Sequence, residues 1–432
     1  MRSVRNLLAV RARVRSGGSQ QPHSWRLRHA LLLGSVGLSV LATAAVARSG
    51  DGDAQCDARY APSLASGSAD PAELGGFTLP LDGERFATLE RSRAKRFSCA
   101  TYRANAPIED RFDVQASLSG DVFAAVFDGH GKFLTSRPRG WQVAEYASKT
   151  LISNVQKELV HAFKDPERSA EAPASPKKVA AAIQRAFGRT DRELMAQVAP
   201  AFKLGFGAVA RCGSCALFTL VHEDFLYVAN AGDIRAVLGK TDPGNREKLL
   251  AVPLSSDQNA MAKAEQEKLT REHPGEANAF TCRHPDSCYV KGALQPTRAF
   301  GDFSLKYPEF NGPAYVHSDR SAGRHFAEPF SPPYITAIPE VKSFRLDKAD
   351  RFVIIGSDGV WDFLSNDEAV EVVREEVAKG NYEHAGRAVV ERTLQKAAKR
   401  YEIPYADLLS LPPGTHRRRR HDDTTAVVLF FE

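Results

Sequence analysis

Acidic residues stand at the ends of several apolar runs, and this is the feature that most constrains the fold. The run VFAAVFDGHGKFLT, residues 122–135, passes directly from an apolar strand pattern into Asp128-Gly129-His130. A carboxylate at the end of a buried strand is unfavourable unless a partner neutralises it. A single Asp there usually forms a turn. The arrangement recurs, however, at Glu109-Asp110, Asp128, Asp233, Asp358 and Asp422-Asp423.

Five such sites in one chain predict that the strand ends converge on shared cations. Carboxylate oxygens are the ligands that the hard ions Mg²⁺ and Mn²⁺ prefer. Asp128, Asp233 and Asp358 each have a Gly neighbour, which suits a backbone that approaches a ligand closely. The sequence has neither a Gly-rich phosphate loop with a Lys nor a GxSxG nucleophile motif.

Strand patterns and helix patterns each come in pairs along the chain. We expect strands over 122–128, 215–232, 235–239, 351–359 and 424–432, with a hairpin turn at residues 222–224. Helical periodicity predicts helices over 140–163, 176–198, 366–380 and 381–400, the third capped by Asn366. Because strands and helices do not alternate singly, the pattern favours an α+β domain with antiparallel sheets.

The N-terminal region differs in composition from the rest. Residues 1–29 are Arg-rich and free of acid, which predicts a targeting leader. Residues 30–47 carry no charge and have the length of a short transmembrane or signal-anchor segment. Residues 48–75 have linker composition, and the folded domain is expected over 76–432. A mitochondrial leader with an inner-membrane anchor and a secretory signal remain open as alternatives.

The net charge of +6 does not indicate a nucleic-acid partner. Residues 1–50 hold eight Arg and no acidic residue, so the rest of the chain carries a net charge of −2. Six Cys in 432 residues do not resemble a disulfide framework, and a reducing or neutral compartment is the default expectation. We expect Cys212 and Cys215 of CGSC to be buried structural residues. CRHPDSC, residues 282–288, leaves a zinc site as a minor alternative.

Six stretches occur together in a specific order: APIEDRF (106–112), VFDGHG (126–131), ANAGDIRAVL (229–238), LQPTRAFGDFSLK (294–306), SDGVWDFLSNDEAV (357–370) and HDDTTAVVLFF (421–431). With this set the chain resembles the type 2C metal-dependent protein serine/threonine phosphatases from about Ser98 to its end. LSSDQNA (254–260), REHPGE (271–276) and PPYITAIPEV (332–341) are similar to the mitochondrial pyruvate dehydrogenase phosphatase branch.

The resemblance implies a four-layer αββα sandwich, in which two antiparallel β-sheets are flanked by helical pairs. It also implies hydrolysis of phosphoserine or phosphothreonine in a phosphoprotein, with two Mg²⁺ or Mn²⁺ ions and a weaker third. Position by position, it implies a metal-bridging role for Asp128 and a carbonyl ligand at Gly129. Asp358 and Asp422 match further metal ligands. Glu109 and Asp110 match acids that hold metal-bound water, and Asp233 and Asp362 match the third site.

His130 is the candidate general acid for the leaving alkoxide, because its ordinary pKa suits proton transfer near neutral pH. Most family members bind the substrate phosphate with an Arg four residues before Glu109, where this chain has Asn105. Asn105, and Arg103 two residues further back, are the candidate contacts to the phosphate. Residues 312–331 are expected to form a flap, and the run Arg417–Arg420 a solvated loop. A catalytically impaired relative that only binds partners is the alternative function. The oligomeric state is left open.

Overall fold

Two antiparallel sheets form the centre of the computed structural model, which describes residues 79–131, 140–163, 175–285, 287–311 and 325–432. The first sheet has the order β1-β2-β14-β13-β7-β8. It consists of β1 (Gly83–Thr88), β2 (Arg96–Tyr102), β14 (Thr424–Phe430), β13 (Asp350–Gly356), β7 (Arg235–Asp242) and β8 (Asn245–Pro253). The second consists of β12 (Glu340–Arg345), β6 (Phe225–Ala231), β5 (Gly213–His222), β4 (Val122–His130) and β3 (Asp110–Ala116) in that order, and β11 (Phe300–Gly301) pairs with β5.

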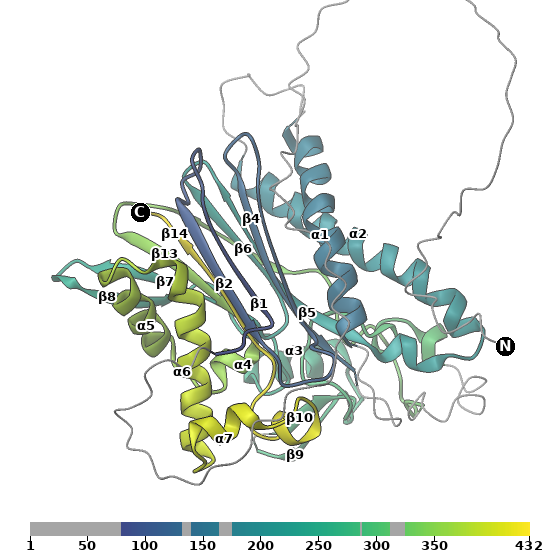
Figure 1. Cartoon of the computed structure of the whole chain (residues 1–432). Helices are drawn as coiled ribbons and strands as arrows, with labels where there is room; N and C mark the ends of the chain where they lie inside the picture. The colour runs from purple at the N-terminus through teal and green to yellow at the C-terminus, as the bar shows by residue number, and fades with distance from the viewer. Residues whose placement is uncertain (1–78, 132–139, 164–174, 286, 312–324) are drawn as a thin grey trace, which may run out of the picture.

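Paired helices cover the outer face of each sheet (Figure 1). Helices α1 (Gly140–Phe163) and α2 (Pro176–Lys203) pack on the second sheet, whereas α5 (Asn366–Ala378) and α6 (Ala385–Arg400) pack on the first. This arrangement confirms the expected α+β class and the four-layer αββα order.

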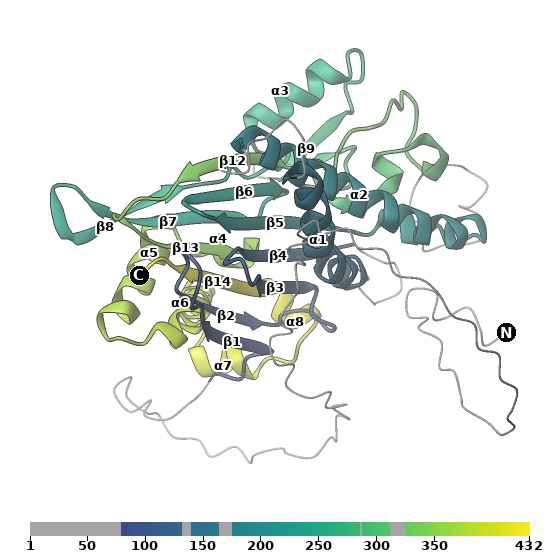
Figure 2. The same ribbon diagram turned by 90° about the horizontal axis from the view of Figure 1, so that it is seen from above.

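Shorter elements connect these layers. They are η1 (Gly207–Arg211), α3 (Lys263–Glu272), β9 (Phe280–His284), β10 (Ser287–Val290), η2 (Phe303–Leu305), η3 (Pro308–Asn311), α4 (Asp358–Trp361), η5 (Tyr382–His384), α7 (Tyr405–Ser410) and α8 (Thr415–Arg418). Helix α3 and the hairpin of β9 and β10 lie outside the two sheets (Figures 1 and 2).

Each interface between layers has its own apolar core, and β4 contributes to two of them. Phe123, Ala125 and Phe127 pack toward α1 and α2, whereas Val122, Ala124 and Val126 pack between the sheets. This two-sided burial explains the continuous apolar run, since neither face of the strand meets water. The same alternation of side chains places Asp128 on the inter-sheet face, where the strand ends.

Most expected elements are present, with two differences. Residues 176–198 belong to one longer helix, α2, and the cap of α5 is Ser365 rather than Asn366. The Ser365 hydroxyl accepts from the Glu368 N–H, and the Glu368 carboxylate accepts from the Ser365 N–H. This reciprocal capping box satisfies two free N–H groups and outcompetes an Asn cap one residue later.

The targeting predictions fall on residues that the structure leaves undescribed. The leader (1–29), the uncharged segment (30–47), the linker (48–75) and most of the expected flap (312–331) lie outside the described ranges. Within those ranges, no helix has the length and hydropathy needed to cross a bilayer.

Candidate active site

Two carboxylates face each other at the end of the inter-sheet core. Asp110 opens β3 and is the direct antiparallel partner of Asp128 at the end of β4. Asp110 is buried, with 2% of its surface exposed. Burial and the charge of nearby Asp423 raise the pKa of Asp110 to about 8. Burial, followed by the charge of Asp358, raises the pKa of Asp128 well above its ordinary value.

The first sheet brings further acids to the same place. Asp358 follows β13 as the first residue of α4, and Asp422 stands two residues before β14. Burial and the charge of Asp422 raise the pKa of Asp358 well above its ordinary value. Burial also raises the pKa of Asp422, to about 6, although the Arg418 guanidinium opposes the rise. Four strand ends from both sheets therefore form one acidic cluster.

Among the residues that the structure describes, several carboxylate oxygens in this cluster lack a hydrogen-bond partner. They are Glu109 Oε1, both Asp110 oxygens and Asp358 Oδ1, all buried. Burial and the charges of Asp423 and Asp422 also raise the pKa of Glu109, to about 8. Unpartnered buried acceptors are strongly unfavourable. An all-oxygen donor set that lacks partners of its own fits a hard divalent cation such as Mg²⁺ or Mn²⁺.

Asp233 follows β6 and lies near Asp128 of β4. Cys215 belongs to β5, the strand between β6 and β4. One ligand atom from each of Asp128, Cys215 and Asp233 falls within 4.8 Å of the others. The Cys215 thiol donates to Asp233 Oδ1 at 3.1 Å, and Asn259 Nδ2 donates to Asp233 Oδ2 at 2.8 Å. Burial raises the pKa of Cys215 well above its ordinary value, so this sulfur remains a protonated donor.

Asp362 lies at the outer edge of the cluster. It is the exposed residue at the C-terminal end of α4, and its backbone carbonyl accepts from Arg400. Burial of its carboxyl raises the pKa of Asp362, and Arg418 opposes this rise.

Gly129 is required by the way α1 begins. A Cβ at Gly129 would lie 2.5 Å from the backbone carbon of Gly140, the first residue of α1, and 2.9 Å from the Glu109 carbonyl oxygen. The Gly129 N–H donates to that same Glu109 carbonyl at 3.3 Å. The close approach of three backbone segments therefore requires Gly at this position.

His130 has a partner that sequence analysis missed. His130 Nε2 lies 2.7 Å from Asp302 Oδ2, and the Asp302 carboxylate is almost fully buried. Burial alone would lower the pKa of His130, but the charge and hydrogen bond of Asp302 outweigh it and raise the pKa above its ordinary value. A Cβ at Gly213 would collide with both side chains, so Gly213 of the CGSC stretch makes room for the pair.

A buried ion pair holds the loop that carries Asp302. Lys306 Nζ donates to Asp191 Oδ2 and to the Ala299 carbonyl, both at 2.8 Å, and the Gly301 N–H donates to Asp191 Oδ1 at 2.8 Å. Asp302 itself has φ 46°, a left-handed conformation that Asp adopts more readily than most residues. These contacts fix the position of the carboxylate that meets His130.

The two residues expected at the phosphate are both engaged elsewhere. Asn105 Nδ2 donates to Asp422 Oδ1 at 3.2 Å and to Asp423 Oδ2 at 3.1 Å. Arg103 forms an ion pair with Asp82 through its Nε, and its backbone N–H donates to the same carboxylate.

Asp423 is an anchor for the loop before β3. Besides the Asn105 amide, its carboxylate accepts from the backbone N–H groups of Ala104, Asn105 and Glu109. Asp423 therefore holds Glu109 in the cluster, whereas Asp422 accepts from the Asn105 amide and the Asp423 N–H through Oδ1 and contacts Arg418 through Oδ2.

The arginines of the run 417–420 have distinct surroundings, which corrects the expectation of a uniformly solvated loop. Arg417 is buried and donates to the carbonyls of Leu411, Leu409 and Arg103. Arg418 Nη2 lies 2.5 Å from Asp422 Oδ2. The run therefore begins as part of the structure that supports the acidic cluster.

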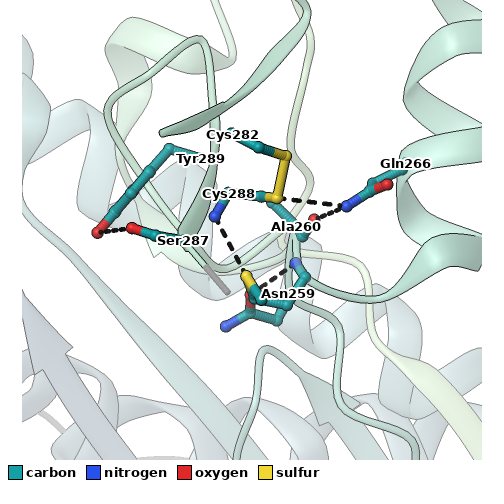
Figure 3. The surroundings of a disulfide bond; sticks show 8 residues. Asn259, Ala260, Gln266, Cys282, Ser287, Cys288 and Tyr289 are labelled. Carbon is teal, nitrogen blue, oxygen red and sulfur yellow. Dashed lines mark hydrogen bonds between the residues drawn. A yellow bond between two sulfur atoms is a disulfide. The ribbon is translucent and has the colours of Figure 1, made fainter. Parts of the chain in front are cut away.

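The cysteine motifs also separate into two cases. Cys212 and Cys215 are buried, as expected. Cys282 and Cys288 form a disulfide across β9 and β10, packed near Gln266 and Met261 (Figure 3). With both sulfurs bonded to each other, the alternative of a zinc site at CRHPDSC is wrong.

Comparison with known proteins agrees with this architecture. The protein phosphatase 2C family model matches residues 90–401. The probable protein phosphatase 2C 68 of Arabidopsis thaliana is 34% identical over 347 residues, covering 80% of this chain and 79% of that protein. The probable protein phosphatase 2C 72 of Oryza sativa subsp. japonica is 32% identical, covering 78% and 79%.

A solved structure shares the fold. The serine-threonine phosphatase 2C from Toxoplasma gondii superposes with a TM-score of 0.52 at 20% identity, covering 81% of this chain and 99% of that one. The fold, the family model and the relatives lead to one conclusion: this chain belongs to the protein phosphatase 2C family and is a protein-serine/threonine phosphatase.

Proposed function

We propose that the chain hydrolyses phosphoserine and phosphothreonine in a phosphoprotein, using divalent cations held by the acidic cluster. The observation that carries the proposal is the set of buried carboxylate oxygens without partners at Glu109, Asp110 and Asp358. Bound cations would neutralise these oxygens, and they would also stabilise the negative charge of the substrate phosphoryl group.

Asp128, the Gly129 carbonyl, Asp358 and Asp422 would hold two Mg²⁺ or Mn²⁺ ions. Glu109 and Asp110 would orient the attacking water, and Asp233 with Asp362 would hold a weaker third ion. Bound ions of this kind lower the pKa of a coordinated water and neutralise charge on the transferring phosphoryl group.

His130 would donate a proton to the departing serine or threonine oxygen. Its Nε2 contact with Asp302 keeps the ring in place and favours the protonated form that an acid requires. Among the described residues, the buried Nδ1 of His130 has no hydrogen-bond partner, so it is the ring nitrogen that would carry the proton to be donated.

The physiological substrate is proposed from the sequence. The likeness to the pyruvate dehydrogenase phosphatase branch, together with the Arg-rich leader, supports a mitochondrial location and the E1 component of pyruvate dehydrogenase or another mitochondrial phosphoprotein as substrate. An inner-membrane anchor at residues 30–47 is consistent with this location, and the secretory pathway is the alternative. Phosphoproteomes of mitochondria with and without the chain would test the substrate; unchanged E1 phosphorylation would contradict it.

The activity itself is tested by release of phosphate from a phosphoserine peptide by the full chain. We expect turnover with Mn²⁺ or Mg²⁺, no turnover with a chelator, and a loss of at least about 100-fold in Asp358→Asn with an unchanged circular dichroism spectrum. Metal-independent turnover, or a wild-type rate in Asp358→Asn, would contradict the proposal. Family membership favours catalysis over a role limited to binding partners.

A further inference from the structure

One arginine, Arg418, contacts the acidic cluster and has no part in the proposed function. A phosphoryl dianion requires a cationic anchor besides any metal ion, and Arg is the side chain best suited to it. Asn105 stands where most family members have that Arg, and its amide is occupied by Asp422 and Asp423. Arg103 is paired with Asp82. A different side chain must therefore serve as the anchor.

Arg418 has the required position. Its guanidinium contacts Asp422, which lies in the same acidic cluster as Asp128 and Asp358. The guanidinium thus lies in the field of the same carboxylates that would hold the cations.

Arg418 also remains open on its other side. Its side chain is 47% exposed, whereas that of Asp422 is 13% exposed. About half of the Arg418 side chain is therefore accessible to a ligand that arrives from solvent.

The neighbouring residue gives Arg418 a rigid base. Arg417 donates to the carbonyls of Leu411, Leu409 and Arg103, and its guanidinium lies 5.0 Å from the centre of the Tyr102 ring. The backbone N–H of Arg418 donates to the Gly414 carbonyl at 2.9 Å. These contacts fix the backbone at Arg417 and Arg418. Binding of a ligand by the Arg418 side chain therefore costs little additional conformational entropy.

We propose that Arg418 binds the phosphoryl group of the substrate, in the role that the family pattern would otherwise give to the residue at position 105. In the cation-free structure Arg418 neutralises Asp422. Once Asp422 is neutralised by a bound cation, the guanidinium can turn its two parallel N–H groups to the phosphoryl oxygens. The inference rests on the proposed function.

Phosphate binding measured apart from turnover tests this role. Inorganic phosphate is titrated into the Mg²⁺-loaded full chain by calorimetry, for the wild type and for Arg418→Ala, Arg418→Lys, Arg420→Ala and Arg103→Ala. Arg420 is the matched control, because it belongs to the same run but lies over Tyr401 instead. Mg²⁺ binding to each variant is titrated separately.

We expect Arg418→Ala to raise the Kd for phosphate at least about tenfold and Arg418→Lys to raise it less, since Lys keeps the charge but not the bidentate geometry. Arg420→Ala should match the wild type, and Mg²⁺ affinity in Arg418→Ala should be unchanged or higher. The KM for a phosphoserine peptide should rise with the Kd for phosphate.

An unchanged Kd for phosphate in Arg418→Ala would overturn the inference. A tenfold rise of this Kd in Arg103→Ala but not in Arg418→Ala would also overturn it. A fall in Mg²⁺ affinity that accounts for all of the phosphate loss would also overturn it. Failure of the proposed function would look different, because the wild type itself would then fail to hydrolyse the peptide with any divalent cation.

Discussion

Asp110 on β3 and Asp128 on β4 are direct partners in an antiparallel pair, and both lie at the end of the inter-sheet core. Burial raises the pKa of both carboxyls, and the charge of Asp110 adds to the rise at Asp128. Like charges opposed in this way destabilise a sheet. The cation-free fold is therefore weakened where the site is built, as expected when function competes with stability.

This relationship predicts how the stability of the cation-free protein depends on pH. The pKa of Asp110 is about 8 in the folded chain and 3.8 ordinarily, so folding favours the protonated form. The stabilising contribution of that form is fully present below pH 3.8 and is lost as pH rises through about 8. We expect Asp110→Asn to be more stable than the wild type by about 2 kcal/mol at pH 8, with a smaller difference at pH 5.

Urea unfolding in the presence of a chelator measures this difference. Asp224→Asn, in the exposed turn between β5 and β6, is the control and should follow the wild type at both pH values. A variant Asp110→Asn with the same stability as the wild type at pH 8 would contradict the prediction.

Cation binding should release protons. The pKa of Glu109 is about 8 and that of Asp422 about 6, so both carboxyls hold protons over part of the neutral range and must lose them to bind a metal. We therefore expect the affinity for Mn²⁺ to increase from pH 6 to pH 8. Calorimetry at pH 7 in buffers of different ionisation enthalpy measures the protons released, and a binding enthalpy independent of the buffer would be evidence against this linkage.

Asp302 should act through His130. Asp302→Asn removes the charge that raises the pKa of His130, so the loss of activity that accompanies deprotonation of His130 should move to lower pH. We expect kcat for a phosphoserine peptide to fall about 10- to 100-fold, and kcat for an aryl phosphate to fall less because its leaving group needs less protonation.

A double-mutant cycle separates this role from a structural one. His130→Ala and Asp302→Asn should be strongly non-additive in kcat, since either change disables the same proton donor. Additive losses, or an unshifted pH profile in Asp302→Asn, would refute the positioning role.

Arg417 should be a stability residue, unlike Arg418. Its buried guanidinium satisfies carbonyls of Leu411, Leu409 and Arg103, which would lose their partner in Arg417→Met. We expect a loss of about 3 kcal/mol in the free energy of unfolding. The exposed Arg419 is the matched control, and Arg419→Met should change stability by less than about 0.5 kcal/mol. Equal effects of the two substitutions in urea unfolding would contradict this assignment.

The convergence of strand-end acids could be predicted from sequence because it follows from local pattern. Asp128 ends a continuous apolar run, and Asp358 follows another, so each position is visible without a fold. The paired strands and helices indicated the α+β class in the same way. Several strands were not expected, among them β1, β2, β3, β8 and β12. The intermediate or exposed residues of β1, β3, β8 and β12 give a weak apolar signal, and the buried strand β2, RFSCATY, mixes polar with apolar residues.

Contacts between distant segments could not be predicted from local pattern. The Asp302 carboxylate meets His130 across 172 residues, and its motif showed only a Gly-Asp turn. Asp422 and Asp423 are adjacent in sequence, yet only the fold distinguishes the loop anchor from the residue that faces the cluster. Gly213, between Cys212 and Ser214, was the available sequence signal for the contact between His130 and Asp302. A Gly in a strand marks a place where another segment approaches closely.

The central claim is that the acidic cluster holds divalent cations, and crystals grown with Mn²⁺ test it most directly. An anomalous difference map recorded near the manganese edge should show two peaks that share Asp128, one of them beside Asp358 and Asp422. A map without a peak within coordination distance of Asp128, from crystals in which the cluster is fully ordered, would contradict the account.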